Sequence, residues 1–211
     1  MCDIWKRNTD LHDPYRLTVD EYKKIFCELR QHANNPFSLT FGGGEPLLRT
    51  DLLDIIKIGA SLGFKTHFST NGYLIDETMA MRIADSGVSF VGISIDSLDS
   101  SIHDSLRGRE GCWERAMNAV TLLKKHCSKK TQINILTIIM SKNIEGIIDL
   151  TRWVSNNSAI TGITFQALDK PPTNNSGDNW YELEEYAELW PRDLHRLNSV
   201  IDELILLAGS R

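Results

Sequence analysis

Three consecutive glycines at residues 42–44 are followed directly by Glu45 and Pro46. Glycine lets a ligand approach the main chain closely. Pro46 fixes its own backbone and moves Glu45 away from helical geometry. We therefore expect a rigid, exposed tip whose carbonyl and carboxylate oxygens point outward and suit a cationic or amine-bearing ligand. A phosphate loop would need converging N–H donors and usually a lysine. The remaining alternative is a glycine-rich turn that only joins a strand to a helix.

Other positions also carry polar groups that could bind a ligand. Ser94 and Asp96 close an apolar segment, and strand alternation places them on the same face. A hydroxyl and a carboxylate at this spacing could hold a ribose diol, and a helix cap is an equal alternative. Asn71 is typical of a turn. Arg107 precedes a glycine and is interpreted either as part of a surface turn or as a clamp for a carboxylate.

The four cysteines lie at positions 2, 27, 112 and 127 and include no C-x-x-C pair, so they indicate no zinc site. We interpret Cys27, Cys112 and Cys127 as small buried hydrophobes. None of the six histidines has metal-ligand spacing with another histidine or a carboxylate. Cys2 is not interpreted as a buried hydrophobe, because of the sequence MCDIWK around it.

These residues need elements that bring them together. Strands are expected at residues 37–41, 64–69, 88–95, 133–140 and 162–168, and helices from Thr18 onward and at 52–63, 76–86, 114–126, 143–156 and 193–208. This alternation predicts an α/β fold of parallel strands with crossover helices, and the nearly continuous apolar strands predict that both sheet faces are covered. The polar positions lie mostly at strand ends, so we expect them at one rim, where such folds bind ligands. A closed eight-unit barrel needs about 250 residues, so this length favours a partial barrel or an open sheet.

Composition narrows the class of protein. The chain has 211 residues, 41% of them apolar and 24% charged, as in an ordinary globular protein. A net charge of -5 gives no general attraction to nucleic acid or to acidic membranes. No apolar run is long enough to cross a bilayer, and no signal peptide is visible. A cytoplasmic location is the default expectation.

Together these residues resemble the radical S-adenosylmethionine (radical SAM) enzymes, over nearly the whole chain. GGEP at residues 43–46 is similar to the motif that contacts the methionine amino group, and STNG at 69–72 and HDSLRGREG at 103–111 recur in many members. The resemblance implies a partial (β/α)6 TIM-like barrel. The SAM contacts that it implies are Gly43, Gly44, Glu45, Pro46, Ser69, Asn71, Ser94 and Asp96 (the last two at the ribose), and Arg107 at the SAM carboxylate.

The resemblance also assigns a role to Cys2. The family holds its [4Fe–4S] cluster with C-x-x-x-C-x-x-C, and Cys2 is similar to the third cysteine of this motif. The other two cysteines and the first barrel strand would then precede residue 1, so the chain as given is expected to bind a cluster poorly. We expect a core at residues 1–168. Residues 169–211 would form a polar connection and a C-terminal helix, leading to an auxiliary domain that this sequence lacks.

The function that the resemblance implies is reductive cleavage of SAM by the cluster. The resulting 5′-deoxyadenosyl radical would take a hydrogen atom from an unknown substrate, a small molecule or a peptide. A ferredoxin or flavodoxin would supply the electron. One alternative is a non-enzymatic remnant that keeps the SAM-binding scaffold. Another is a barrel lyase or aldolase that uses Glu45 and Asp96. For this alternative the sequence offers no candidate Schiff-base lysine at a strand end.

Overall fold

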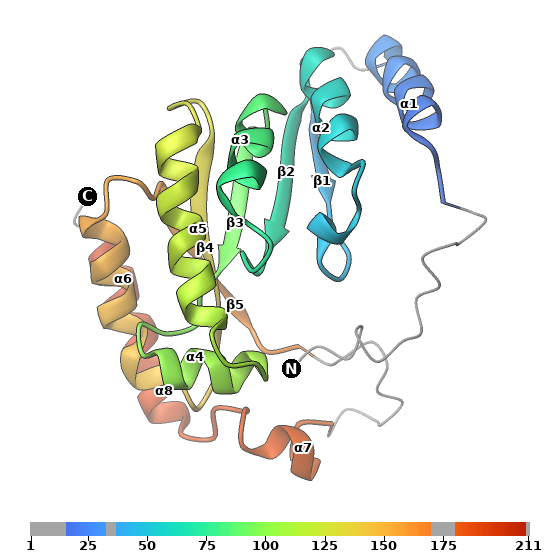
Figure 1. Ribbon diagram of the computed structural model, residues 1–211. Coiled ribbons are helices and arrows are strands. Elements are labelled where there is room, and N and C mark those ends of the chain that lie inside the picture. The colour runs from blue at the N-terminus through green and yellow to red at the C-terminus, as the bar shows by residue number, and fades with distance from the viewer. Residues whose placement is uncertain (1–15, 33–36, 170–179, 210–211) are drawn as a thin grey trace.

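A computed structural model describes residues 16–32, 37–169 and 180–209. Its centre is one sheet of five parallel strands in sequence order, which confirms the expected α/β class (Figure 1). The strands are β1 (Ser38–Phe41), β2 (Lys65–Thr70), β3 (Phe90–Ser94), β4 (Gln132–Ile139) and β5 (Gly162–Ala167). Because all five run the same way, their carboxyl ends share one edge, toward the bottom of Figure 1. We call this edge the rim.

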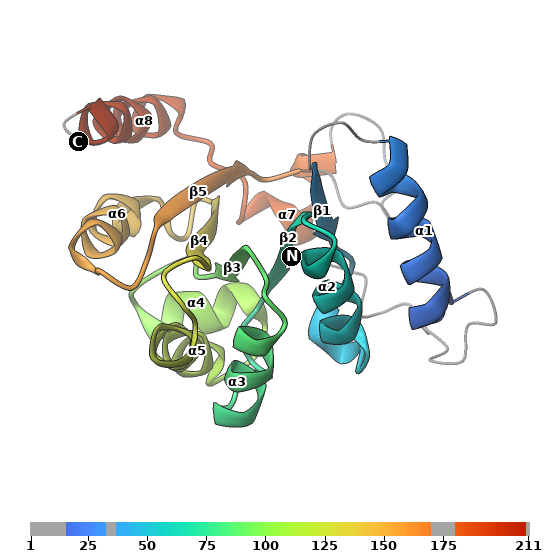
Figure 2. The ribbon, with the colours of Figure 1, turned by 90° about the horizontal axis from the view of Figure 1, so that it is seen from above.

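The first expected helix precedes the sheet, and the others follow the strands in turn. They are α1 (Val19–His32), α2 (Leu52–Ser61), α3 (Glu77–Asp85), α5 (Cys112–His126), α6 (Ile147–Asn156) and α8 (Leu194–Gly209), joined by short 3-10 turns at Pro46–Leu48, Ile144–Gly146 and Trp180–Glu182. Figure 2 shows the sheet as an arc with α2, α3, α5 and α6 on its outer side. In the described part of the chain, no helix is long and apolar enough to span a membrane.

Two helices were not predicted. The segment between β3 and α5 contains α4 (Ser100–Arg107), and residues 184–187 form the short α7 (Glu184–Ala187). Helix α4 begins because the Asp99 side chain accepts hydrogen bonds from two backbone N–H groups, and it ends where Gly108 adopts φ +69°. Both α4 and α7 lie at the rim (Figure 1).

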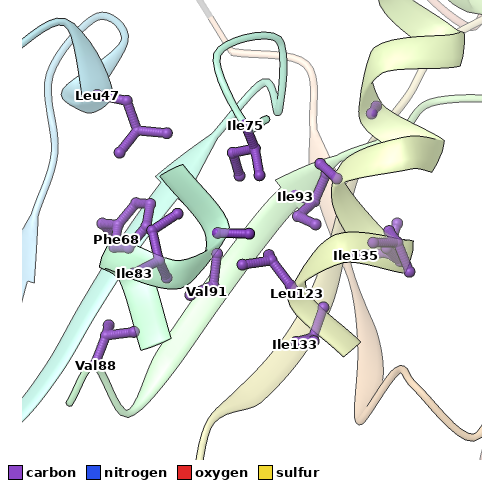
Figure 3. Close-up of a cluster of buried hydrophobic side chains, with 14 of the residues drawn as sticks. Leu47, Phe68, Ile75, Ile83, Val88, Val91, Ile93, Leu123, Ile133 and Ile135 are labelled. Atoms are coloured by element: carbon purple, nitrogen blue, oxygen red, sulfur yellow. The ribbon is translucent and has the colours of Figure 1, made fainter. Parts of the chain in front are cut away.

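The main core fills the space between the sheet and the outer helices (Figure 3). Phe68, Ile93 and Ile135 come from adjacent strands and are fully buried against Ile83 of α3 and Leu123 of α5. Burying one such side chain stabilises the fold by roughly 1.5–3 kcal/mol. The core therefore fixes the order of the strands and the position of their ends.

The expectation that both sheet faces are covered is wrong for most strands in the described residues. Buried and accessible positions alternate along β2, whose Thr66, Phe68 and Thr70 are buried while Ser69 is exposed. Thr164 and Gln166 of β5 are also exposed. Among the described strands, β3 and β4 are each buried through three consecutive residues. The inner face of the sheet is thus partly exposed, and it carries polar side chains such as Ser69 and Thr164.

Two smaller clusters hold the first and last helices. Phe26 of α1 packs with Ile55 and Phe64. Val200 of α8 packs with Ile147 of α6 in a cluster that includes Phe165 of β5. The Thr18–Glu21 spacing correctly predicted the start of α1, because Thr18 N–H donates to Glu21 Oε2 at 2.7 Å and Glu21 N–H donates to Thr18 Oγ1 at 3.3 Å.

Candidate functional site

The Glu45 carboxylate joins the ends of two neighbouring strands. Its Oε1 accepts hydrogen bonds from Thr70 Oγ1 at 2.8 Å and from Leu47 N–H at 3.2 Å, and its Oε2 accepts one from Asn71 N–H at 2.9 Å. The expectation that this carboxylate points outward is therefore wrong. The end of β2 places two donors beside it, and a half-buried carboxylate is stabilised by such donors. Glu45 fixes the glycine tip, as we call residues 42–46, against the turn after β2.

The backbone of the glycine tip is open to its surroundings. Residues 42–44 are exposed, and a Cβ atom at Gly42 or Gly43 would meet no heavy atom within 4 Å. Gly43 has φ +141°, a conformation that other residues rarely adopt. Glycine is therefore required here by backbone conformation rather than by crowding, and space remains beside the main-chain polar groups for a ligand.

Asn71 and Ser69 lie next to the glycine tip with different roles. Asn71 Oδ1 accepts a hydrogen bond from Tyr73 N–H at 2.8 Å, which confirms its interpretation as a turn residue. Ser69 is exposed on the inner face of the sheet. A Cβ atom added to Gly92 would lie 3.1 Å from Ser69 Oγ and 2.6 Å from Leu136 Cδ1. Gly92 thus leaves room for these two side chains on the inner face.

Asp96 lies just beyond the end of β3 and is held on every side. Its side chain is 0% exposed, with Oδ2 2.7 Å from Arg107 Nη2. Its Oδ1 accepts a hydrogen bond from Ile138 N–H at 3.2 Å. Its backbone N–H donates to His103 Nδ1 at 3.1 Å, and its carbonyl oxygen accepts from Asn143 Nδ2 at 2.8 Å. Ser94, two residues earlier, is half-buried.

Arg107 ends α4 with its guanidinium against Asp96, and its side chain is 20% exposed. The surface-turn interpretation of Arg107 is therefore wrong. The turn itself is formed by Gly108, which caps the helix. Because α4 carries both His103 and Arg107, four residues apart, both side chains reach the same carboxylate residue.

Sequence reasoning missed His103, Asn143 and Thr70 as parts of this arrangement. The pKa of His103 is lowered to about 4, mainly by burial and secondarily by the positive charge of Arg107. The neutral ring accepts the Asp96 N–H through Nδ1, which places its own proton on Nε2. The i, i+4 spacing of His103 and Arg107 was the available signal, and it depended on recognising α4 as a helix.

The metal-ligand prediction falls outside this geometry. Cys2 lies outside the described residues. Within those residues, no group of three histidine, cysteine, aspartate or glutamate side chains could hold a metal ion. Cys27, Cys112 and Cys127 are half-buried free thiols. Burial raises the pKa of Cys112, and it raises that of Cys127 to about 11. These two thiols are therefore poor thiolate ligands at neutral pH.

The chain is similar to known proteins in sequence and in fold. The chain is 29% identical over 189 residues to the AdoMet-dependent heme synthase of Oleidesulfovibrio alaskensis, covering 89% of this chain and 47% of that protein. Among solved structures, Streptococcus suis SuiB with its precursor peptide SuiA has TM-score 0.67 and 19% identity, covering 99% of this chain and 44% of that one. SuiB bound to S-adenosylmethionine has TM-score 0.64 and 18% identity, covering 92% and 40%. These structural likenesses support the fold.

The chain spans about half the length of the curated relatives it matches. The family model described as "Radical SAM superfamily" matches residues 1–154, which is more than half of the chain and includes the glycine tip, Asp96 and Arg107. The five parallel strands and the polar rim agree with that match. The chain therefore belongs to the Radical SAM superfamily.

Proposed function

We propose that the protein of which this chain forms the core binds SAM at the rim and cleaves it reductively. The observation that carries this proposal is the Glu45 carboxylate, which fixes the exposed glycine tip to the end of β2 through Thr70 and Asn71. Open main-chain carbonyl groups beside a fixed carboxylate suit an ammonium group, because both are hydrogen-bond acceptors. Membership of the superfamily supports the identification of that ammonium as the amino group of SAM.

The residues at the rim fit the remaining groups of SAM. Gly43, Gly44, Glu45 and Pro46 would hold the amino group, with Ser69 and Asn71 beside them. Ser94 is half-buried near the end of β3 and would hold the ribose. Arg107 would bind the carboxylate, since a guanidinium keeps several N–H donors after one of them has met Asp96.

A [4Fe–4S] cluster, with Cys2 as one ligand, would supply the electron that cleaves SAM to methionine and a 5′-deoxyadenosyl radical. A ferredoxin or flavodoxin in the cytoplasm is proposed as the source of that electron. The task of the described residues is to bind and orient SAM. Glu45, Arg107 and Ser94 would fix its amino acid and ribose groups from three different segments of the rim.

The substrate is proposed to be an organic molecule that meets the inner face of the sheet. Polar positions continue along that face from Ser69 to Asn134, whose Nδ2 donates to Thr164 Oγ1 at 2.7 Å. One similar protein is a heme synthase and another was solved with a precursor peptide, so both small molecules and peptides stay candidates.

The segment of residues 180–192 is a second candidate substrate contact. It docks at the rim where Ser141 N–H donates to Leu189 O at 2.9 Å and Lys142 Nζ lies 3.0 Å from Glu188 Oε2. Its Tyr181 and Trp190 rings stack at 4.8 Å. We propose that this aromatic stack contacts substrate, and that the core ends near residue 168.

The test measures SAM cleavage directly. The 211-residue chain and the full product of its reading frame are reconstituted anaerobically with iron and sulfide, reduced with dithionite and given SAM. Mass spectrometry follows 5′-deoxyadenosine and methionine. We expect cleavage by the full product, with a large loss in Ser94→Ala and none in the matched variant Ser199→Ala on the exposed surface of α8.

The outcomes separate the alternatives. A full product that holds an intact cluster and forms no 5′-deoxyadenosine would overturn the proposal. SAM binding by both proteins without any cleavage would favour the non-enzymatic scaffold. Cleavage that does not depend on Ser94 would overturn the assignment of the ribose contact.

A further inference from the structure

Every polar group of Asp96 faces a protein partner, and the contact between its Oδ2 and Arg107 Nη2 is an ion pair without hydrogen-bond geometry. Its backbone N–H, its carbonyl oxygen and both carboxylate oxygens each face a protein partner within 3.2 Å. These partners come from α4, from the strand β4 and from the turn that follows β4. An isolated ribose contact would not need such a complete set of supports.

The same supports bury the carboxylate. The side chain of Asp96 is 0% exposed, whereas that of Arg107 is 20% exposed. Ile138 N–H and Arg107 Nη2 approach the two oxygens separately. A ribose hydroxyl could reach Asp96 only by displacing one of these partners, which would leave a buried charge or N–H group without compensation.

Arg107 is the member of this pair that can meet an anion. Its Nε is buried, and within the described residues no hydrogen-bond partner satisfies it. A guanidinium has five N–H donors, and only Nη2 faces Asp96. The exposed part of the side chain therefore retains donors that a carboxylate can bind, with an orientation set by the contact to Asp96.

We propose that Asp96 is a positioning residue that acts on SAM through Arg107, and that it makes no contact with the ribose. Asn143 and His103 hold the backbone of Asp96, Ile138 holds Oδ1, and Oδ2 directs the guanidinium toward the SAM carboxylate. This inference rests on the proposed function, because it concerns the same SAM site. It changes the role assigned to Asp96 and leaves Ser94 as the ribose contact.

Two probes distinguish a ribose contact from an effect through Arg107. S-adenosylhomocysteine contains the ribose and the amino acid carboxylate, whereas 5′-methylthioadenosine contains the ribose and lacks the carboxylate. Calorimetry measures the dissociation constant of each probe for the wild type, Asp96→Asn, Arg107→Gln, the double variant and Ser94→Ala. Neither probe needs a cluster, so the described chain itself can be used.

We expect Asp96→Asn and Arg107→Gln each to raise the dissociation constant of S-adenosylhomocysteine by at least about tenfold, which is the loss expected for one charge-assisted contact. Both variants should bind 5′-methylthioadenosine like the wild type. The double variant should be no weaker than Arg107→Gln, because Asp96 acts only through that residue. Ser94→Ala should weaken both probes and serves as the matched ribose control.

The opposite pattern would overturn the inference. If Asp96→Asn weakens the binding of 5′-methylthioadenosine, then Asp96 contacts the ribose. The same conclusion follows if Asp96→Asn further weakens the binding of S-adenosylhomocysteine in the Arg107→Gln background. A single variant can fail to fold because one charge stays buried, whereas the double variant lacks both charges. Its affinity for 5′-methylthioadenosine then shows whether Asp96 contacts the ribose. A wild-type chain that binds neither probe would refute this inference, whereas the proposed function is overturned by a full product that holds an intact cluster and forms no 5′-deoxyadenosine.

Discussion

Acidification should destabilise this fold through His103. The ring is 1% exposed, and its Nδ1 accepts the backbone N–H of Asp96 at 3.1 Å. Burial and the nearby charge of Arg107 lower its pKa from 6.5 to about 4, although Asp96 and Asp104 act in the opposite direction. Protonation would place an N–H group where an acceptor is needed.

The sign and size of the effect follow from proton linkage. Between pH 6.5 and 4 the unfolded chain takes up a proton at this histidine that the folded chain does not, so the free energy of unfolding falls as the pH falls. For these two pKa values the loss between pH 7 and pH 5 is about 2 kcal/mol. Above pH 7 both states carry the neutral ring, and the contribution no longer changes.

The assay is urea unfolding followed by circular dichroism at pH 7 and pH 5. His103→Asn is the matched variant, because its Oδ1 can replace Nδ1 as the acceptor and does not titrate. Other groups change protonation in both proteins, so the difference between their pH dependences isolates His103. The wild type should lose about 2 kcal/mol more than the variant over this range. Equal losses would refute the structural reasoning.

Three further predictions concern backbone conformation, packing and thiol reactivity. In urea unfolding, Gly43→Ala should lower the free energy of unfolding by about 1–3 kcal/mol, because Gly43 has φ +141°. The matched variant Gly42→Ala should leave that free energy unchanged or raise it slightly. Gly92→Ala should lower the free energy of unfolding by about 1–3 kcal/mol. Adding Leu136→Ala should recover part of that loss, because the new Cβ lies 2.6 Å from Leu136 Cδ1. Strictly additive effects of the two substitutions on the free energy of unfolding would contradict this prediction. Iodoacetamide at pH 8 should modify Cys127 about a hundredfold more slowly in the folded chain than in urea, because burial raises the pKa of this thiol to about 11. Peptide mass mapping measures both rates, and equal rates would argue against the burial of Cys127.

The sequence alone predicted the arrangement that depends on short-range patterns. Alternating strands and helices indicated a parallel sheet, and parallel strands necessarily bring their carboxyl ends to one edge. The glycine run, Ser69 and Ser94 could therefore be placed at one rim without a structure. The Thr18–Glu21 pair also marked the start of α1, because a capping box needs only residues three apart.

Contacts between distant residues were decided only by the tertiary structure. Asn143 reaches Asp96 across 47 residues and Glu45 meets Asn71 across 26. A carboxylate in a sequence has no fixed direction, because it turns toward whichever donors the neighbouring elements place beside it. For Glu45 those donors lie at the end of β2, and for Asp96 they lie on α4 and β4. Residue type and spacing thus located the rim, whereas strand register and helix packing determined which of its carboxylates stay open to a ligand.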